Sequence, residues 1–148
     1  MPPAWVAGYV GLPFKAHGRD RNGLDCWGLV RLVLLEVFSV DVPCFVTQYS
    51  SVKDFNEIER IIEKEKQSWI SIPRGEERLG DVIVIRNEGK DSHVGLVLGN
   101  NEMLHTEIGI DSVPKNYLET DVKFRITGFY RHARIDPSRK DNSGSDPQ

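Results

Sequence analysis

The alternation of hydrophobic and polar positions divides the chain into a helical first half and a strand-rich second half. Residues 25–39 are apolar on almost every side, which predicts a buried central helix. Residues 4–11 predict a short N-terminal helix, and residues 52–69 carry apolar side chains at helical spacing, which predicts an amphipathic helix. Residues 13–24 are rich in glycine and charge, and they predict a loop.

Short apolar segments separated by turn signals predict strands in the second half of the chain. The Asn100-Asn101 pair is typical of a tight turn, and it predicts a hairpin between the segments on either side of it. The predicted strands cover residues 80–86, 92–99, 103–106, 108–113 and 123–131. Helices followed by consecutive short strands predict an α+β fold, in which the central helix packs on an antiparallel β-meander.

The length and the composition indicate one domain. A chain of 148 residues matches the usual size of a single domain, which we place at residues 1–135. Residues 136–148 contain two prolines, several polar residues and no bulky apolar residue, so they predict a disordered tail.

The charge balance argues against several classes of partner. The chain carries 19 basic and 22 acidic residues, a net charge of −3, so no basic excess indicates a nucleic-acid-binding protein. No apolar stretch reaches the ~18 residues of a membrane span. The N-terminus lacks the basic-then-apolar layout of a secretory signal, which predicts synthesis and folding in the cytoplasm.

Of the two cysteines, Cys26 has the position expected of a reactive thiol. It lies in the first turn of the central helix, where unpaired backbone N–H groups and the helix dipole favour thiolate, the nucleophilic form. Cys44 follows that helix, whose length would separate the two residues by roughly 20 Å. A disulfide requires Cα atoms within about 7 Å, so we interpret Cys44 as a structural thiol.

Two histidines complete a candidate site. His93 lies near the start of one predicted strand and His105 near the end of the next, so the hairpin predicts that they are neighbours without being directly opposed. A cysteine nucleophile needs an imidazole that takes its proton, and that imidazole needs a third group to orient it. Each residue could instead be a buried structural side chain. The three together could also ligate zinc, although no CxxC or HExxH pattern supports that reading.

The residues around Cys26 resemble a known family. The segment Asn22–Val30 is similar to the nucleophile motif of the NlpC-type cell-wall peptidases, which are papain-like cysteine hydrolases. Residues 9–14 resemble the segment that precedes this motif in the family, and residues 80–84 resemble its first core strand. Residues 92–99 resemble the strand that bears the general base, and residues 103–105 resemble the strand that bears the orienting residue. The resemblance extends over residues 5–131.

The resemblance implies a papain-like fold and hydrolysis of an amide bond in peptidoglycan stem peptides, often the bond between D-glutamyl and the diamino acid. It implies that Cys26 is the nucleophile, that His93 is the base and then the acid, and that His105 orients His93. It implies neither a cofactor nor a metal. The residues expected to contact the substrate are Phe14, Asp25, Trp27 and Ser92. From its position alone, Asp25 is also a candidate helix cap.

Two departures from the family pattern point to a particular branch. The family usually has tyrosine at Phe14 and serine at Trp27. The bulky Trp27, the Arg19-Asp20-Arg21 segment and the aliphatic helix with Arg31 and Glu36 resemble the branch found in phage tail-tip proteins. That branch implies synthesis in the host cytoplasm, assembly with other tail-tip proteins into the virion tail, and action on the wall during infection. A structural tail module with weak or no catalysis is the alternative, and an amidase or acyltransferase on another substrate is a third possibility.

Overall fold

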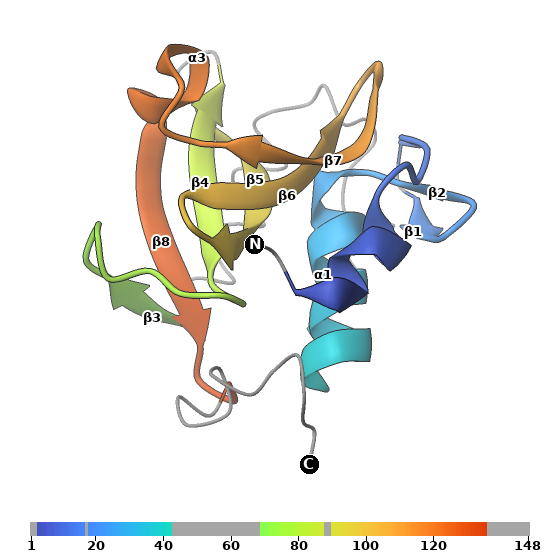
Figure 1. Cartoon of the computed structure of the whole chain (residues 1–148), viewed down its shortest axis with the longest axis horizontal. Coiled ribbons are helices and arrows are strands. Elements are labelled where there is room, and N and C mark those ends of the chain that lie inside the picture. Colours follow the sequence, from blue (N-terminus) through green and yellow to red (C-terminus); the bar gives the residue numbers. More distant parts are fainter. Residues whose placement is uncertain (1–2, 17, 43–68, 88–89, 136–148) are drawn as a thin grey trace.

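In the part of the chain that the structure describes, a long helix packs with an antiparallel sheet, as the sequence predicts (Figure 1). The computed structural model describes residues 3–16, 18–42, 69–87 and 90–135. Within these ranges helix α1 (Cys26–Phe38) packs against strands β5 (Lys90–Gly99) and β6 (Glu102–Glu107). The α+β class is therefore confirmed.

Helix α1 lies within the predicted range of residues 25–39, and the structure shows a cap at each end. Asp25 is extended and its carboxylate accepts a hydrogen bond from the backbone N–H of Gly28, which satisfies one of the free donors of the first turn. Ser39 adopts a left-handed conformation with φ of 59°, and its N–H donates to the carbonyl of Leu34. The eight buried residues of the helix are Trp27, Gly28, Leu29, Val30, Leu32, Val33, Leu34 and Phe38.

Four consecutive strands of the sheet form a meander, and the other two strands are added at one edge of it. Its order is β3-β8-β4-β5-β6-β7, and all neighbouring strands are antiparallel. The remaining strands are β3 (Trp69–Ile72), β4 (Val82–Asn87), β7 (Ile110–Asn116) and β8 (Ile126–His132). Strands β4 to β7 follow one another as predicted.

The prediction of a simple meander is wrong for the last strand. β8 does not continue beside β7 but crosses to pair with β4, after the short helix α3 (Thr120–Lys123). The first four residues of β4 are buried, and pairing on both sides satisfies the backbone groups of such a strand. Trp69, expected at the end of a helix, instead begins β3 and pairs with His132. The rest of that predicted helix and the predicted tail lie outside the described residues.

Apolar side chains form two clusters. The larger one joins α1 to alternate residues of the sheet, among them Val84, Val94 and Leu104. The smaller one contains the intervening residues, among them Ile83, Ile85 and Met103. This alternation is expected of strands that are covered on both faces.

The glycine-rich segment before α1 is more ordered than a loop. It contains a hairpin of two short strands, β1 (Arg19–Asp20) and β2 (Gly23–Leu24), so the prediction of a loop over residues 13–24 is wrong in this part. The predicted N-terminal helix is present as a 3₁₀ helix, η1 (Ala4–Tyr9). No helix in the described ranges is long and apolar enough to cross a bilayer.

Candidate active site

Cys26 lies where the helix meets the sheet. It is the first residue of α1, directly after the capping Asp25, and it is half-buried. Its thiol lies within hydrogen-bonding reach of the backbone of Val94, the residue that follows His93 in β5. The fold therefore places the thiol beside the start of the strand that carries the first histidine.

The thiol is protonated at neutral pH, contrary to the prediction from helix position. Burial raises the pKa of Cys26 to about 12, and the adjacent Asp25 carboxylate adds to the rise. Hydrogen bonds from the backbone of Val94 and Trp27, and the charge of Arg19, lower the pKa by less. The cost of desolvating the thiolate is larger than the stabilisation that the helix N-terminus provides, because removing a charge from water is costly even where nearby dipoles favour the charge.

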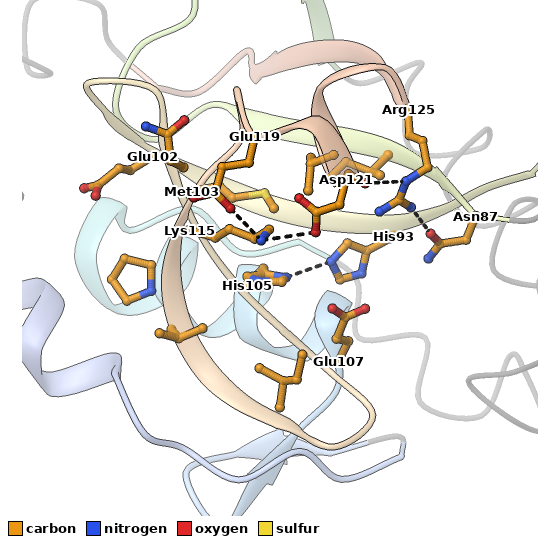
Figure 2. Close-up of a pocket in the computed structure, with 16 residues that line it drawn as sticks. Asn87, His93, Glu102, Met103, His105, Glu107, Lys115, Glu119, Asp121 and Arg125 are labelled. Carbon is orange, nitrogen blue, oxygen red and sulfur yellow. Dashed lines mark hydrogen bonds and ion pairs between the residues drawn. The ribbon is translucent and has the colours of Figure 1, made fainter.

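His93 and His105 are in direct contact. Nε2 of His93 lies 3.0 Å from Nδ1 of His105, and the ring centroids are 5.3 Å apart at an interplanar angle of 80°. Both residues are buried, at 6% and 3% exposure. Figure 2 shows the two side chains pointing toward each other. The prediction that the hairpin makes these two histidines neighbours is confirmed.

Both imidazoles are neutral at physiological pH. Burial lowers the pKa of His93 to about 3, with smaller contributions from His105 and Arg125. Burial also lowers the pKa of His105 to about 4, and the nearby Lys115 ammonium adds to this effect while Asp121 opposes it. A neutral imidazole has one N–H and one free nitrogen, so one ring of this pair donates and the other accepts.

The contact determines what His93 can do. If His105 accepts at Nδ1, His93 carries its proton on Nε2 and its Nδ1 is free to take a proton. If His105 were charged, both of its nitrogens would be donors, and His93 would hold its proton on Nδ1 instead. A neutral His105 is therefore a condition for His93 to act as a base.

A cavity of about 470 Å³ adjoins the histidine pair. Its wall includes Lys115, whose ammonium lies 3.1 Å from Glu119 and 3.3 Å from Asp121 (Figure 2). Arg125 borders the same cavity and donates to the side chain of Asn87. The cavity has room for a small side chain and presents charges of both signs beside the imidazoles.

Asp25, expected to contact the substrate, caps helix α1 and forms an ion pair in the structure. Its side chain is 2% exposed, accepts from the backbone of Gly28 at 2.8 Å, and pairs with Arg19 at 2.7 Å. The candidate cap is confirmed. The pairing of Arg19 with this carboxylate was not expected from the sequence. The one available signal was that an arginine stood six residues before the cap in a glycine-rich segment.

The other expected contact residues lie at different depths. Phe14 is half-buried and forms an isolated bridge with Leu24, two residues before Cys26. Trp27 is buried, at 7% exposure. Ser92 belongs to β5, directly before His93, and its side chain is outside what the structure describes. Cys44 also lies outside the described residues.

A metal site was an open alternative for Cys26, His93 and His105. Among the residues that the structure describes, no group of three histidine, cysteine, aspartate or glutamate side chains is arranged to hold a metal ion. The contact between Nε2 and Nδ1 instead joins the two imidazoles to each other.

Comparison with known sequences identifies relatives over most of the described chain. Residues 11–126 match the model of the NlpC/P60 family. The murein DD-endopeptidase/murein LD-carboxypeptidase MepS of Escherichia coli K12 is 25% identical over 99 residues, which are 67% of this chain and 44% of that protein. The probable endopeptidase NlpC homolog of Haemophilus influenzae is 25% identical over 113 residues, 74% of this chain and 51% of that protein. The chain thus spans about half the length of these curated relatives.

Solved structures share the fold. The NlpC/p60 domain of the peptidoglycan hydrolase SagA superposes with a TM-score of 0.61 at 21% identity, over 86% of this chain and 92% of that one. An NlpC/P60 family protein from Bacillus cereus superposes with a TM-score of 0.66 at 16% identity, over 89% of this chain and 41% of that one. The papain-like α+β fold expected from the sequence is confirmed by these neighbours.

Proposed function

The chain belongs to the NlpC/P60 family, and from this membership we propose that it is a cysteine peptidase that hydrolyses an amide bond in peptidoglycan stem peptides. The observation that carries the proposal is the position of the Cys26 thiol beside the strand that bears His93, together with the contact between His93 and His105. Cys26 begins α1 beside the backbone of β5, and the His93–His105 pair lies at the start of that strand with a contact of 3.0 Å.

The reaction begins from a neutral thiol and a neutral imidazole. Nδ1 of His93 takes the proton from Cys26 as the sulfur attacks the scissile carbonyl, because Nε2 is engaged with His105. The backbone N–H of Cys26, at the helix N-terminus, stabilises the oxyanion. His93 then protonates the leaving amine, which leaves a thioester on Cys26. A water molecule that loses its proton to His93 hydrolyses this thioester.

The substrate assignment draws on the relatives. MepS is named a murein endopeptidase and SagA a peptidoglycan hydrolase. For this chain we propose the bond between D-glutamyl and the diamino acid, which the family resemblance implies. The cavity beside the histidine pair is large enough for a small peptide side chain.

The decisive experiment is digestion of purified peptidoglycan, with the released fragments read by mass spectrometry. We expect the wild type to release stem-peptide fragments whose masses identify the cleaved bond, and Cys26→Ala to release none. Cys44→Ala is the matched control, because it removes the other thiol and is expected to keep activity. Cleavage by Cys26→Ala would contradict the thiol mechanism.

We further propose that the protein acts as a phage tail-tip component, synthesised in the host cytoplasm and assembled with other tail-tip proteins. The support is the resemblance of Trp27, the Arg19-Asp20-Arg21 segment and the helix with Arg31 and Glu36 to that branch. Mass spectrometry of purified particles tests this location, and the protein should copurify with tails. Its absence from the particles would contradict this part of the proposal.

A structural tail module with weak or no catalysis is the second candidate. Two observations favour it, namely the missing hydroxyl at Phe14 and the protonated, desolvated thiol of Cys26. Particles that carry Cys26→Ala separate the two functions. If they assemble and then fail to penetrate the wall, the enzyme is supported. If they assemble and infect normally, the structural module is supported.

A further inference from the structure

The β1–β2 hairpin contacts the first turn of the helix that carries Cys26. Nη1 of Arg19 donates to Oδ1 of Asp25 at 2.7 Å and to the carbonyl oxygen of Gly18 at 2.7 Å. The Arg19 side chain is 11% exposed and that of Asp25 is 2% exposed. The same Oδ1 atom accepts from the backbone N–H of Gly28 at 2.8 Å. One hairpin side chain therefore holds the carboxylate that caps the nucleophile helix.

Close backbone packing keeps the hairpin in this position. A Cβ atom on Gly28 would lie 2.1 Å from the carbonyl oxygen of Gly18, and a Cβ on Gly18 would lie 2.1 Å from that of Gly23. Glycine is required at both positions because the two backbones approach too closely for any side chain. Arg19 thus reaches Asp25 from a backbone that lies directly against the first turn.

The charges around the thiol make this contact relevant to its chemistry. Asp25 precedes Cys26 and is buried, so its negative charge disfavours a thiolate, whereas the Arg19 guanidinium favours one. The histidines carried by β5 and β6, His93 and His105, are neutral at pH 7 because burial lowers the pKa of each. Among the residues that the structure describes, Asp25 and Arg19 are therefore the charged pair that acts on the sulfur.

We propose that Arg19 is a positioning residue for Cys26. The positive charge of Arg19 opposes the negative charge of Asp25 at the sulfur, and its hydrogen bond holds that carboxylate on the first turn of α1. An Asn cap would satisfy the same backbone N–H without a charge. Asp25 differs from an Asn cap because its charge also binds Arg19 and so anchors the hairpin. The positive charge of Arg19 offsets the effect of the Asp25 carboxylate, which disfavours the thiolate of Cys26. The inference rests on the proposed function only for its catalytic consequence.

Alkylation of Cys26 by iodoacetamide tests this inference without a wall substrate. The rate is measured from pH 7 to 10 by peptide mass spectrometry, which separates Cys26 from Cys44. The variants are Arg19→Gln, Asp25→Asn and the double variant. Arg21→Gln is the matched control, because Arg21 lies on the same hairpin but pairs with Glu36. Circular dichroism checks that each variant is folded.

The proposal predicts shifts in opposite directions. Arg19→Gln should slow alkylation and Asp25→Asn should accelerate it, with the double variant close to the wild type and Arg21→Gln unchanged. Each unit of thiol pKa should change the rate about three- to fourfold, because a more basic thiolate is also more nucleophilic. A merely structural contact would move the alkylation rates of Arg19→Gln and Asp25→Asn in the same direction, and that result, or rates that match the wild type at every pH, would overturn the proposal.

Arg19→Lys and Asp25→Asn keep the test decisive if Arg19→Gln does not fold. Lysine restores the charge, so Arg19→Lys should alkylate at close to the wild-type rate, and Asp25→Asn should remain faster. Slower or unchanged alkylation of Asp25→Asn would contradict the inference. The alkylation test involves no peptidoglycan, so a negative result would contradict the role of Arg19 without contradicting the proposed hydrolysis. Likewise, a failure of the protein to digest the wall would not change the alkylation result.

Discussion

Nε2 of His93 lies 3.0 Å from Nδ1 of His105, although the two residues are not opposite each other in the β5–β6 hairpin. Leu96 pairs with Leu104, and continuing this register places Glu107 opposite His93. The histidines are diagonal neighbours, a separation that long side chains can span. The buried rings meet edge to face, and the contact engages Nε2 of His93 with Nδ1 of His105.

The role of His105 as an acceptor can be tested by comparing two substitutions. His105→Ala should lower kcat/KM for peptidoglycan fragments by on the order of a hundredfold, because His93 loses the partner that orients it. His105→Gln should lose less, since its amide oxygen can still accept from Nε2 of His93. Equal losses in the two variants, measured on the same fragment, would contradict the acceptor role.

The stability of the protein should fall in acid because both histidines are buried and neutral. The pKa of His93 is about 3 and that of His105 about 4, against 6.5 for a free imidazole. At a pH between the folded-state pKa and 6.5, the unfolded chain binds a proton on each imidazole that the folded chain does not bind. The free energy of unfolding therefore decreases as pH falls below about 6.5. Each imidazole contributes a slope of up to about 1.4 kcal/mol per pH unit.

Urea unfolding from pH 7 to 4.5 measures this slope. The variant His93→Gln/His105→Gln should show a smaller decrease than the wild type, and Arg21→Gln, which retains every histidine, should show the same decrease. Parallel curves for the wild type and the double variant would show that the imidazoles are protonated in the folded state.

A buried ion pair connects the start of β4 to the end of β8, and its loss should be costly. Arg131 donates to both oxygens of Asp81, at 2.7 and 2.8 Å, and the Asp81 side chain is fully buried. Arg131→Met should reduce the free energy of unfolding by about 3–5 kcal/mol, because it leaves a buried charge without its partner.

The double variant Asp81→Asn/Arg131→Met should recover part of this stability, since the charge is removed with its partner. The exposed pair of Arg21 and Glu36 provides the control, and Arg21→Gln should cost at most about 1 kcal/mol. Guanidinium denaturation compares all three. If Arg131→Met costs no more than Arg21→Gln, the buried pair does not have the stabilising role inferred here.

Gly28 should not tolerate a side chain although it lies inside a helix. Alanine normally stabilises a helix interior by up to about 1 kcal/mol relative to glycine. At Gly28, however, the new Cβ would lie 2.1 Å from the backbone oxygen of Gly18, so we expect Gly28→Ala to destabilise the protein by about 1–3 kcal/mol. Gly8→Ala is the control, because a Cβ there meets nothing within 4 Å. Thermal unfolding should separate the two variants, and equal midpoints would contradict the close packing.

Phe14 offers a substitution that should increase activity. It pairs with Leu24 near the nucleophile, at the position where the family resemblance implies a tyrosine. Phe14→Tyr adds a hydroxyl that can donate to the substrate or the oxyanion, so kcat should rise by about fivefold, the effect of one hydrogen bond of roughly 1 kcal/mol. Phe14→Leu, which adds no donor, should not increase kcat. A gain with leucine, or no gain with tyrosine, would contradict this role.

Local patterns in the sequence determined much of the architecture. The candidate cap Asp25 marks the start of α1, and the Asn100-Asn101 turn marks the hairpin that brings His93 near His105. These features are predictable because a cap or a tight turn depends on the conformations of a few consecutive residues. The resemblance of the cysteine and histidine segments to a family was likewise visible in short motifs.

The tertiary structure alone decided the position of β8, the partner of Asp25 and the protonation of Cys26. β8 crosses the sheet to β4, and Arg19 reaches Asp25 from a hairpin that the sequence predicted as a loop. The helix position of Cys26 favours thiolate, but burial raises its pKa to about 12. The reason is common to all three, because strand partners, ion pairs and desolvation depend on residues that are distant in the chain and meet only in the folded protein.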